Sequence, residues 1–112
     1  ELRLMEEQIN TFTTIDSRPY RLVPLHMGPI RIDEDGERLP STYANFLIMN
    51  NTVLMPTYGD KELDDKATSQ LQKAFPKHDI VGIDCQVLIR QHGSLHCCTM
   101  QFPIGIIPST QD

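Results

Sequence analysis

The feature that most restricts the fold of this chain is the order of segments between residues 43 and 83. The runs YANFLIM and TVLMP are short, apolar and rich in residues that favour strands, and Asn50 and Asn51 separate them. Asparagine accepts the positive φ that a tight turn between two strands requires. We therefore expect an antiparallel hairpin here.

An amphipathic helix is predicted after the hairpin. Asp60 is placed to cap this helix, and Pro76 is expected to end it. Four apolar residues fall on one helical face: Leu63, Ala67, Leu71 and Ala74. The run DIVGI that follows is typical of a buried strand. Residues 43–83 are thus predicted to form a β-β-α-β unit, and the fold class to be α+β.

The flanking segments predict less regular structure. Residues 1–12 carry apolar side chains at helical spacing, and the lack of a capping residue before them indicates a longer parent sequence or a frayed first turn. Prolines interrupt the runs YRLVPLH and PIRID, so edge-like or irregular strands are expected there. A loop tip is expected around Gly36, and the final run FPIGIIPSTQD resembles a tail.

Length and composition are those of one small globular domain, with 112 residues, 39% hydrophobic and 22% charged. The net charge of −5 provides no electrostatic footprint for nucleic acid or for an anionic membrane, but it tolerates a cationic small substrate. No apolar run approaches the length of a membrane span, and ELRLMEEQIN lacks the features of a signal peptide. Three cysteines, two of them adjacent, fit free thiols in a reducing compartment. We expect a cytoplasmic protein with no nucleic-acid or membrane partner.

The run HGSLHCCTM leaves a choice between a catalytic, a metal-binding and a structural role for its thiols. As a strand, it would place His96 and Cys98 on one face and Cys97 on the other. Zinc is disfavoured because there is no C-x-x-C and no second ligand cluster. Nucleophilic chemistry needs a thiolate, a proton-transferring group and an orienting partner, and sequence order does not reveal which histidine would serve. On the residues alone, a core position is the commoner outcome for such a cysteine.

Several segments taken together resemble a known family. YANFLIMNNTVLMPTYGD, the helix after it, FPKHDIVGID and GSLHCCTMQFP look like the C-terminal portion of the agmatine deiminase and Porphyromonas-type peptidylarginine deiminase family, over about residues 15–103. The resemblance implies a pentein, a five-bladed propeller of ββαβ modules. Five modules do not fit in 112 residues. We therefore expect residues 1–112 to be a C-terminal fragment with about two modules, residues 43–83 forming the best-defined one and residues 84–103 the catalytic-cysteine segment.

The resemblance also implies the site residues. The family's C-terminal motif is a glycine-rich run followed by Asn, an aliphatic residue, His, the catalytic Cys and Thr. Its matching positions here are Gly93, Leu95, His96, Cys97 and Thr99. Cys97, not Cys98, would then be the nucleophile, while Gly93 and His96 would support the site.

Asn45, in the run YANF, matches a family asparagine that assists the active site on the peptidylarginine deiminase side. The sequence also departs from the family's pattern. Gln91 and His92 stand where agmatine deiminases tend to have glycine, and Ser94 stands in the asparagine position. These departures leave Cys97 as the expected nucleophile and bear on the identity of the substrate.

The chemistry implied by the resemblance is hydrolysis of a guanidine. A cysteine thiolate attacks the guanidinium carbon of agmatine or of a peptidyl arginine, ammonia leaves, and water hydrolyses the covalent thiouronium. The resemblance implies no metal or organic cofactor. In the family, an H-x-D motif supplies the acid/base histidine and earlier modules supply carboxylates that bind the guanidinium. No H-x-D occurs here, so we expect the fragment alone to be inactive.

Two further expectations accompany this interpretation. A partial propeller exposes faces that missing modules would cover, which favours a homo-oligomer or self-association of the fragment. The alternative to an enzyme is a noncatalytic small α/β binding or regulatory module, in which Cys97 is a structural residue.

Overall fold

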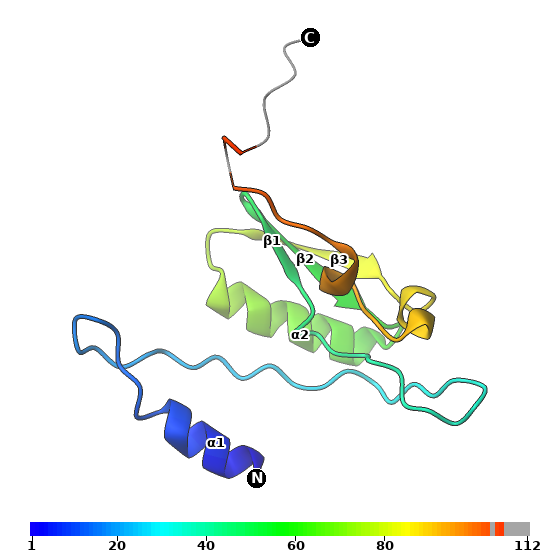
Figure 1. Cartoon of the computed structure of the whole chain (residues 1–112), viewed down its shortest axis with the longest axis horizontal. Coiled ribbons are helices and arrows are strands. Elements are labelled where there is room, and N and C mark those ends of the chain that lie inside the picture. Colours follow the sequence, from blue (N-terminus) through cyan, green and yellow to red (C-terminus); the bar gives the residue numbers. More distant parts are fainter. Residues whose placement is uncertain (104, 107–112) are drawn as a thin grey trace.

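The computed structural model describes residues 1–103, 105 and 106 (Figure 1). Its regular part is one ββαβ module made of β1 (Leu47–Met49), β2 (Thr52–Thr57), α2 (Lys61–Ala74) and β3 (Asp79–Asp84). The strands form a single sheet in the order β1-β2-β3, in which β1 runs antiparallel and β3 parallel to β2. The predicted order of elements across residues 43–83 is therefore confirmed.

Local sequence signals explain where these elements begin and end. Asn50 adopts a φ of 52° at the turn between β1 and β2, a left-handed conformation that asparagine tolerates. At the start of α2, a side-chain oxygen of Asp60 accepts the Leu63 N–H at 3.1 Å, which satisfies one of the helix's free backbone donors. The helix ends at Ala74, shortly before Pro76.

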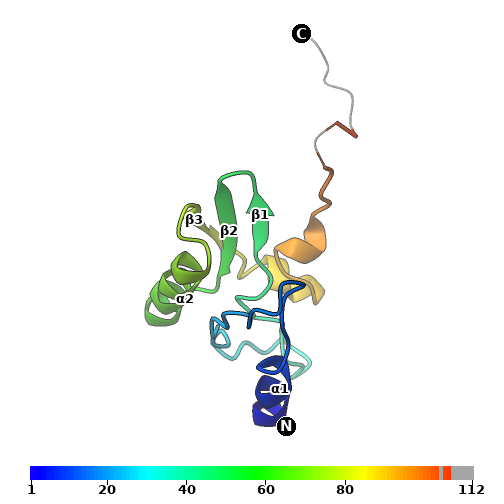
Figure 2. The same cartoon turned by 90° about the vertical axis from the view of Figure 1, so that its left-hand side faces the viewer.

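The core lies between α2 and the sheet and continues under the segment that follows β3. Figure 2 shows α2 and the C-terminal segment on opposite sides of the sheet. Buried hydrophobic residues come from β2, from α2 and from the loops around them, and they include Tyr43, Val53, Met55, Tyr58, Ala67, Leu71, Cys85 and Ile89. Both faces of β2 are thus covered, which makes β2 the rigid centre from which the loops are positioned.

The expectation for DIVGI as a buried strand was wrong. Within the described residues β3 pairs only with β2, and Val81 remains 42% exposed. Ile80 and Ile83 pack against the core, whereas Asp79 and Asp84 point to solvent. A short apolar run is compatible with either a central or an edge strand of a sheet, and its sequence does not show which of the two it forms.

The N-terminal region is an exposed helix followed by irregular chain. Helix α1 (Leu2–Ile9) confirms the expected helix, but none of its residues is buried. Residues 13–42 form isolated bridges instead of named strands, and the predicted loop tip is a turn in which Gly36 has a φ of 84°. This segment runs alongside α2 (Figure 1) and is attached through His26, whose Nδ1 lies 2.6 Å from Oε1 of Gln70.

Two other sequence expectations concern the chain ends and membranes. Part of the predicted tail, residue 104 and residues 107–112, lies outside the described residues. In the part of the chain that the structure describes, neither α1 nor α2 has the length and apolarity that crossing a membrane requires.

Candidate active site around Cys97

Cys97 lies in a short 3₁₀ helix, η2 (His96–Cys98), and not in a strand. The turn is closed by the Cys98 N–H to the Leu95 carbonyl at 3.2 Å, and the Thr99 hydroxyl donates to the His96 carbonyl at 2.8 Å. The strand alternation considered for this run therefore does not apply, and Cys97 and Cys98 are both exposed. Three residues of 3₁₀ helix are too short to produce a recognisable period in the sequence.

Asn45 meets Cys97 across a gap of 52 positions in the sequence. Its side-chain amide nitrogen donates to Sγ of Cys97 at 3.3 Å. Its side-chain oxygen accepts the backbone N–H of His96 at 2.7 Å and that of Cys97 at 3.3 Å. One asparagine side chain thus fixes the η2 backbone and places a donor on the sulfur.

These contacts favour the thiolate form of Cys97. A hydrogen bond with the backbone of Ser94, followed by the bond from the Asn45 side chain, lowers the pKa of Cys97 below its ordinary value. Cys85 shows the opposite behaviour, because burial and the nearby charge of Asp84 raise its pKa. Cys97 therefore combines exposure with a lowered pKa, as a nucleophile needs, whereas Cys85 is buried.

Gly93 provides the space in which η2 approaches the preceding loop. A Cβ built on Gly93 would lie 3.1 Å from Cβ of Cys97 and 3.0 Å from Nε2 of Gln91. Any side chain at this position would have to push the Cys97 turn or the Gln91 side chain outward. The structure thus gives Gly93 a steric role beside Cys97.

We expect the substitution Gly93→Ala to slow iodoacetamide alkylation of Cys97 several-fold, because the added methyl group displaces η2 from Asn45. Gly82→Ala is the matched control, since its Cβ would meet a side-chain methyl of Thr57 at a similar 3.0 Å, on β3. The rate of Cys97 alkylation is measured by mass spectrometry of the peptide that begins at Gln91. An equal rate in the two alanine variants would contradict a specific role for Gly93.

The histidines are distributed around the molecule and not gathered at the thiol. His96 contributes its backbone N–H to Asn45, while its side chain is exposed. His26 uses its ring nitrogens on Gln70 and on the Leu63 carbonyl. His92 faces a carboxylate oxygen of Asp33 at 3.4 Å. The structure therefore brings Asn45, Gly93 and the His96 backbone to Cys97, but it shows no imidazole paired with the sulfur among the described residues.

Sequence reasoning missed Tyr58 and the contacts that Ser94 and Gln91 make underneath and beside the two thiols. Ser94 and Tyr58 are both fully buried and lie within hydrogen-bond distance of each other, at 2.8 Å. Gln91 donates its side-chain amide to Sγ of Cys98 at 3.2 Å. A buried serine immediately before an exposed cysteine turn is not visible in the sequence pattern, because its partner Tyr58 lies 36 positions earlier in the chain.

A cavity of about 560 Å³ lies near the site but does not contain the thiol. It is lined by Arg31, Asp33, Arg90, His92 and neighbouring residues. Neither Cys97 nor Asn45 is among its lining residues, and the Cys97 side chain is exposed. In the described residues, no group of three or more His, Cys, Asp or Glu side chains is arranged to hold a metal ion.

The sequence profile of the Porphyromonas-type peptidyl-arginine deiminase family matches residues 1–103. The chain belongs to this family. A Marinomonas protein provisionally named an agmatine deiminase is 38% identical over 102 residues, which cover 77% of this chain and 27% of the relative. The chain thus spans less than a third of that family member's length.

Solved structures of the family agree with the fold. A Porphyromonas gingivalis protein provisionally named an arginine deiminase is 52% identical, with a TM-score of 0.83 over 93% of this chain and 30% of that one. A cysteine-to-serine variant of C. jejuni agmatine deiminase with substrate bound is 36% identical, with a TM-score of 0.66 over 85% of this chain and 26% of that one. These likenesses confirm the expected fold, a part of a pentein.

Proposed function

We propose that these residues supply the nucleophile of a guanidine-modifying hydrolase that deiminates agmatine to N-carbamoylputrescine and ammonia, or peptidyl arginine to citrulline. The observation that carries the proposal is the exposed Cys97 thiol, held by Asn45 at 3.3 Å, with a lowered pKa. The substrate-bound C. jejuni relative, in which serine replaces a cysteine, supports a guanidine substrate and a central role for a cysteine.

The reaction divides into two steps at the guanidinium carbon. The Cys97 sulfur forms a bond to this carbon, and the tetrahedral adduct expels ammonia after a general acid has protonated the departing nitrogen. Water then attacks the carbon of the resulting thiouronium and gives one proton back to the general acid, now acting as a base, and the other to ammonia or solvent. The C–S bond breaks, the product carries a urea group in place of the guanidine, and the sulfur returns as thiolate. Hydrogen bonds from Asn45 and the Ser94 backbone stabilise that thiolate at both ends of the cycle.

The remaining catalytic groups are expected from other modules of a longer polypeptide. The sequence contains no H-x-D motif, and carboxylates that bind a guanidinium in bidentate fashion must face the sulfur from outside this segment. The profile match and the coverage of relatives support this view. The net charge of −5 supports a cationic substrate and argues against nucleic-acid or anionic membrane partners. The three cysteines support a reducing, cytoplasmic location.

The proposal is tested by ammonia release. The complete polypeptide that contains these residues is incubated with agmatine, free arginine and an arginine peptide, and the isolated 112-residue chain is assayed beside it. We expect turnover of one guanidine by the complete polypeptide and none by the isolated chain. Absence of turnover by the complete polypeptide would favour a noncatalytic binding module, and turnover by the isolated chain would refute the need for other modules.

Exposed apolar side chains support self-association of the isolated chain. On and after α1, Leu2 is 82% exposed and Phe12 58% exposed, and Met100 near the site is 79% exposed. We propose that other modules cover these side chains in a longer protein. In the isolated chain, we propose that a second copy covers them. Sedimentation velocity is the measurement, and a single sharp monomer boundary at high concentration would argue against this proposal.

A further inference from the structure

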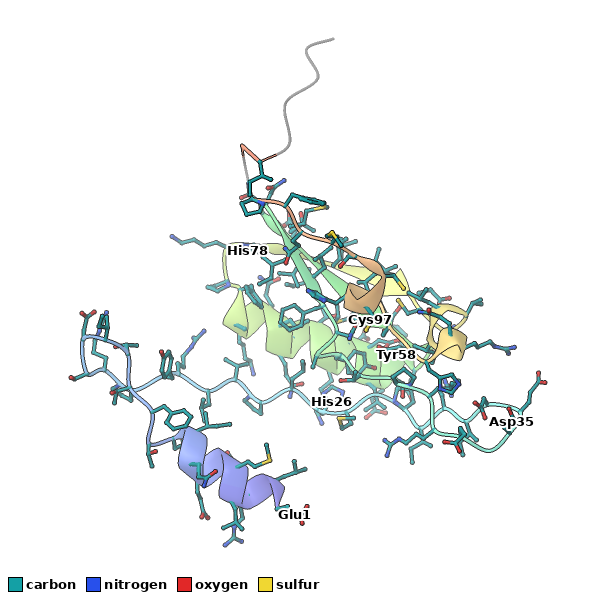
Figure 3. All side chains as sticks on the ribbon, in the orientation of Figure 1. Glu1, His26, Asp35, Tyr58, His78 and Cys97 are labelled. Atoms are coloured by element: carbon teal, nitrogen blue, oxygen red, sulfur yellow. The ribbon has the colours of Figure 1, made fainter. Side chains whose placement is uncertain are left out.

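Tyr58 occupies the space beneath the two residues of the candidate site. It follows β2 directly, is fully buried, and packs its ring 5.5 Å from that of Tyr43. Figure 3 labels Tyr58 and Cys97 on the same part of the molecule. Because β2 is the most enclosed strand, this tyrosine presents its hydroxyl from a rigid base.

The partners of the Tyr58 hydroxyl are the loops that carry Asn45 and Cys97. The hydroxyl donates to the Thr42 carbonyl at 2.8 Å and lies 2.8 Å from Oγ of Ser94. Thr42 and Ser94 stand three positions before Asn45 and Cys97, respectively. One hydroxyl therefore joins two loops that are otherwise distant in the sequence.

Each partner is connected directly to the site residue that follows it. The Thr42 carbonyl that accepts the Tyr58 hydroxyl also accepts the Asn45 backbone N–H at 3.3 Å. The Ser94 backbone is the first cause of the lowered pKa of Cys97, ahead of the Asn45 side chain. A shift of either loop would therefore change the hydrogen bonds on the thiol.

The direction of these hydrogen bonds follows from what each group can donate. A carbonyl oxygen only accepts hydrogen bonds, so Tyr58 donates its single hydroxyl proton to the Thr42 carbonyl. Ser94 must then donate its hydroxyl proton to the Tyr58 oxygen. Burial raises the pKa of Tyr58, so the hydroxyl keeps its proton across the neutral range. The bond between Tyr58 and Ser94 is buried and that to Thr42 is partly buried, so the loss of either partner is expected to destabilise this arrangement.

We propose that Tyr58 is a positioning residue whose hydroxyl sets the separation between the Asn45 loop and the Cys97 turn. This inference rests on the proposed function, in which Cys97 is the nucleophile. Tyr58 does not touch the thiol; it acts by holding the Ser94 backbone and the Asn45 side chain in place around it. Removal of the hydroxyl alone should therefore reduce the thiolate character of Cys97 while the aromatic core remains filled.

The test is the pH profile of Cys97 alkylation in the complete polypeptide, with iodoacetamide as the probe. Tyr58→Phe is expected to move the midpoint of the profile to higher pH and to slow alkylation at pH 7 by about three- to tenfold, the size of effect that one hydrogen bond has. Tyr43→Phe is the control: Tyr43 is equally buried, and its hydroxyl donates at 2.7 Å to the Asp64 oxygen that also accepts the Tyr58 backbone N–H, so this variant disturbs the surroundings of Tyr58 but keeps its hydroxyl bonds to Thr42 and Ser94. This control is expected to leave the midpoint unchanged.

A second variant keeps the test decisive if Tyr58→Phe folds poorly. Ser94→Ala removes the same hydrogen bond from the other side and should shift the midpoint in the same direction. In a double-variant cycle, the two substitutions together should slow Cys97 alkylation by less than the product of their separate fold-changes. Unchanged midpoints in both single variants, or equal shifts with Tyr43→Phe, would overturn the inference.

Failure of the proposed function would look different. In that case the unaltered polypeptide releases no ammonia from any guanidine, while the alkylation profiles still report the pKa of Cys97. A different result would be an active unaltered enzyme in which Tyr58→Phe leaves the midpoint of Cys97 alkylation unchanged. That result would support the proposed function and contradict the positioning role of Tyr58.

Discussion

Replacement of Cys97 by serine in the complete polypeptide is expected to lower kcat for ammonia release by roughly 10⁵-fold or more, as loss of a covalent nucleophile does in other enzymes. The reason is chemical. A serine hydroxyl in the same turn receives the same hydrogen bonds from Asn45 and Ser94, but its pKa lies far above that of a thiol, so little alkoxide forms. Ammonia released from saturating agmatine or arginine peptide, measured over hours, gives the rate.

Cys98→Ser is the matched control for this substitution. Cys98 is the adjacent residue and is also exposed, but its Sγ receives an amide hydrogen bond from Gln91 at 3.2 Å and none from Asn45. We expect this variant to retain a rate close to that of the unaltered protein. If Cys98→Ser lost activity and Cys97→Ser kept it, the nucleophile would be Cys98, and the assignment to Cys97 would be wrong.

Asn45→Ala is expected to reduce the rate of ammonia release by about 10²-fold, the scale of a misplaced or unsupported reacting group. The alanine removes the donor on Sγ and the acceptor for the backbone N–H of His96 and Cys97 at once. The pKa of Cys97 should rise toward its ordinary value. The thiolate fraction at neutral pH then falls, so the rise in activity with pH should occur at higher pH than in the unaltered protein.

The pH profile of kcat/KM separates this explanation from general damage. If Asn45 acts on the thiol, alkaline pH should restore part of the lost rate, because the thiolate forms there without help. Asn51→Ala, an exposed asparagine in the hairpin turn, provides the control and should show an unaltered profile. A uniform loss at every pH in Asn45→Ala, with no shift of the profile, would contradict the role given to Asn45.

The sequence predicts the ββαβ module well because its signals are local. The turn at Asn50 and the cap at Asp60 depend on neighbouring residues, and the structure shows both. The exposure of β3 and of α1 was not predictable, since an apolar stripe indicates a face to be buried but not whether its partner is present.

The site is predicted less completely than the fold. Cys97, Gly93 and Asn45 emerge through resemblance to a family motif, and the structure then places Asn45 on the thiol. The strand considered for the run HGSLHCCTM does not form, and residues 96–98 adopt a 3₁₀ turn that has no periodic signal in the sequence. The Tyr58–Ser94 contact had no sequence signal, because a buried polar network depends on pairing in space.

The most direct test of the central claim, that Cys97 is the activated thiol, is labelling with 2-chloroacetamidine, whose amidinium resembles a guanidinium. The complete native polypeptide is treated at neutral pH, and tandem mass spectrometry of the peptide beginning at Gln91 locates the label. We predict modification of Cys97 with Cys98 and Cys85 unlabelled, and loss of this selectivity after denaturation. Equal labelling of Cys97 and Cys98 in the native protein, or none at Cys97, would contradict the claim.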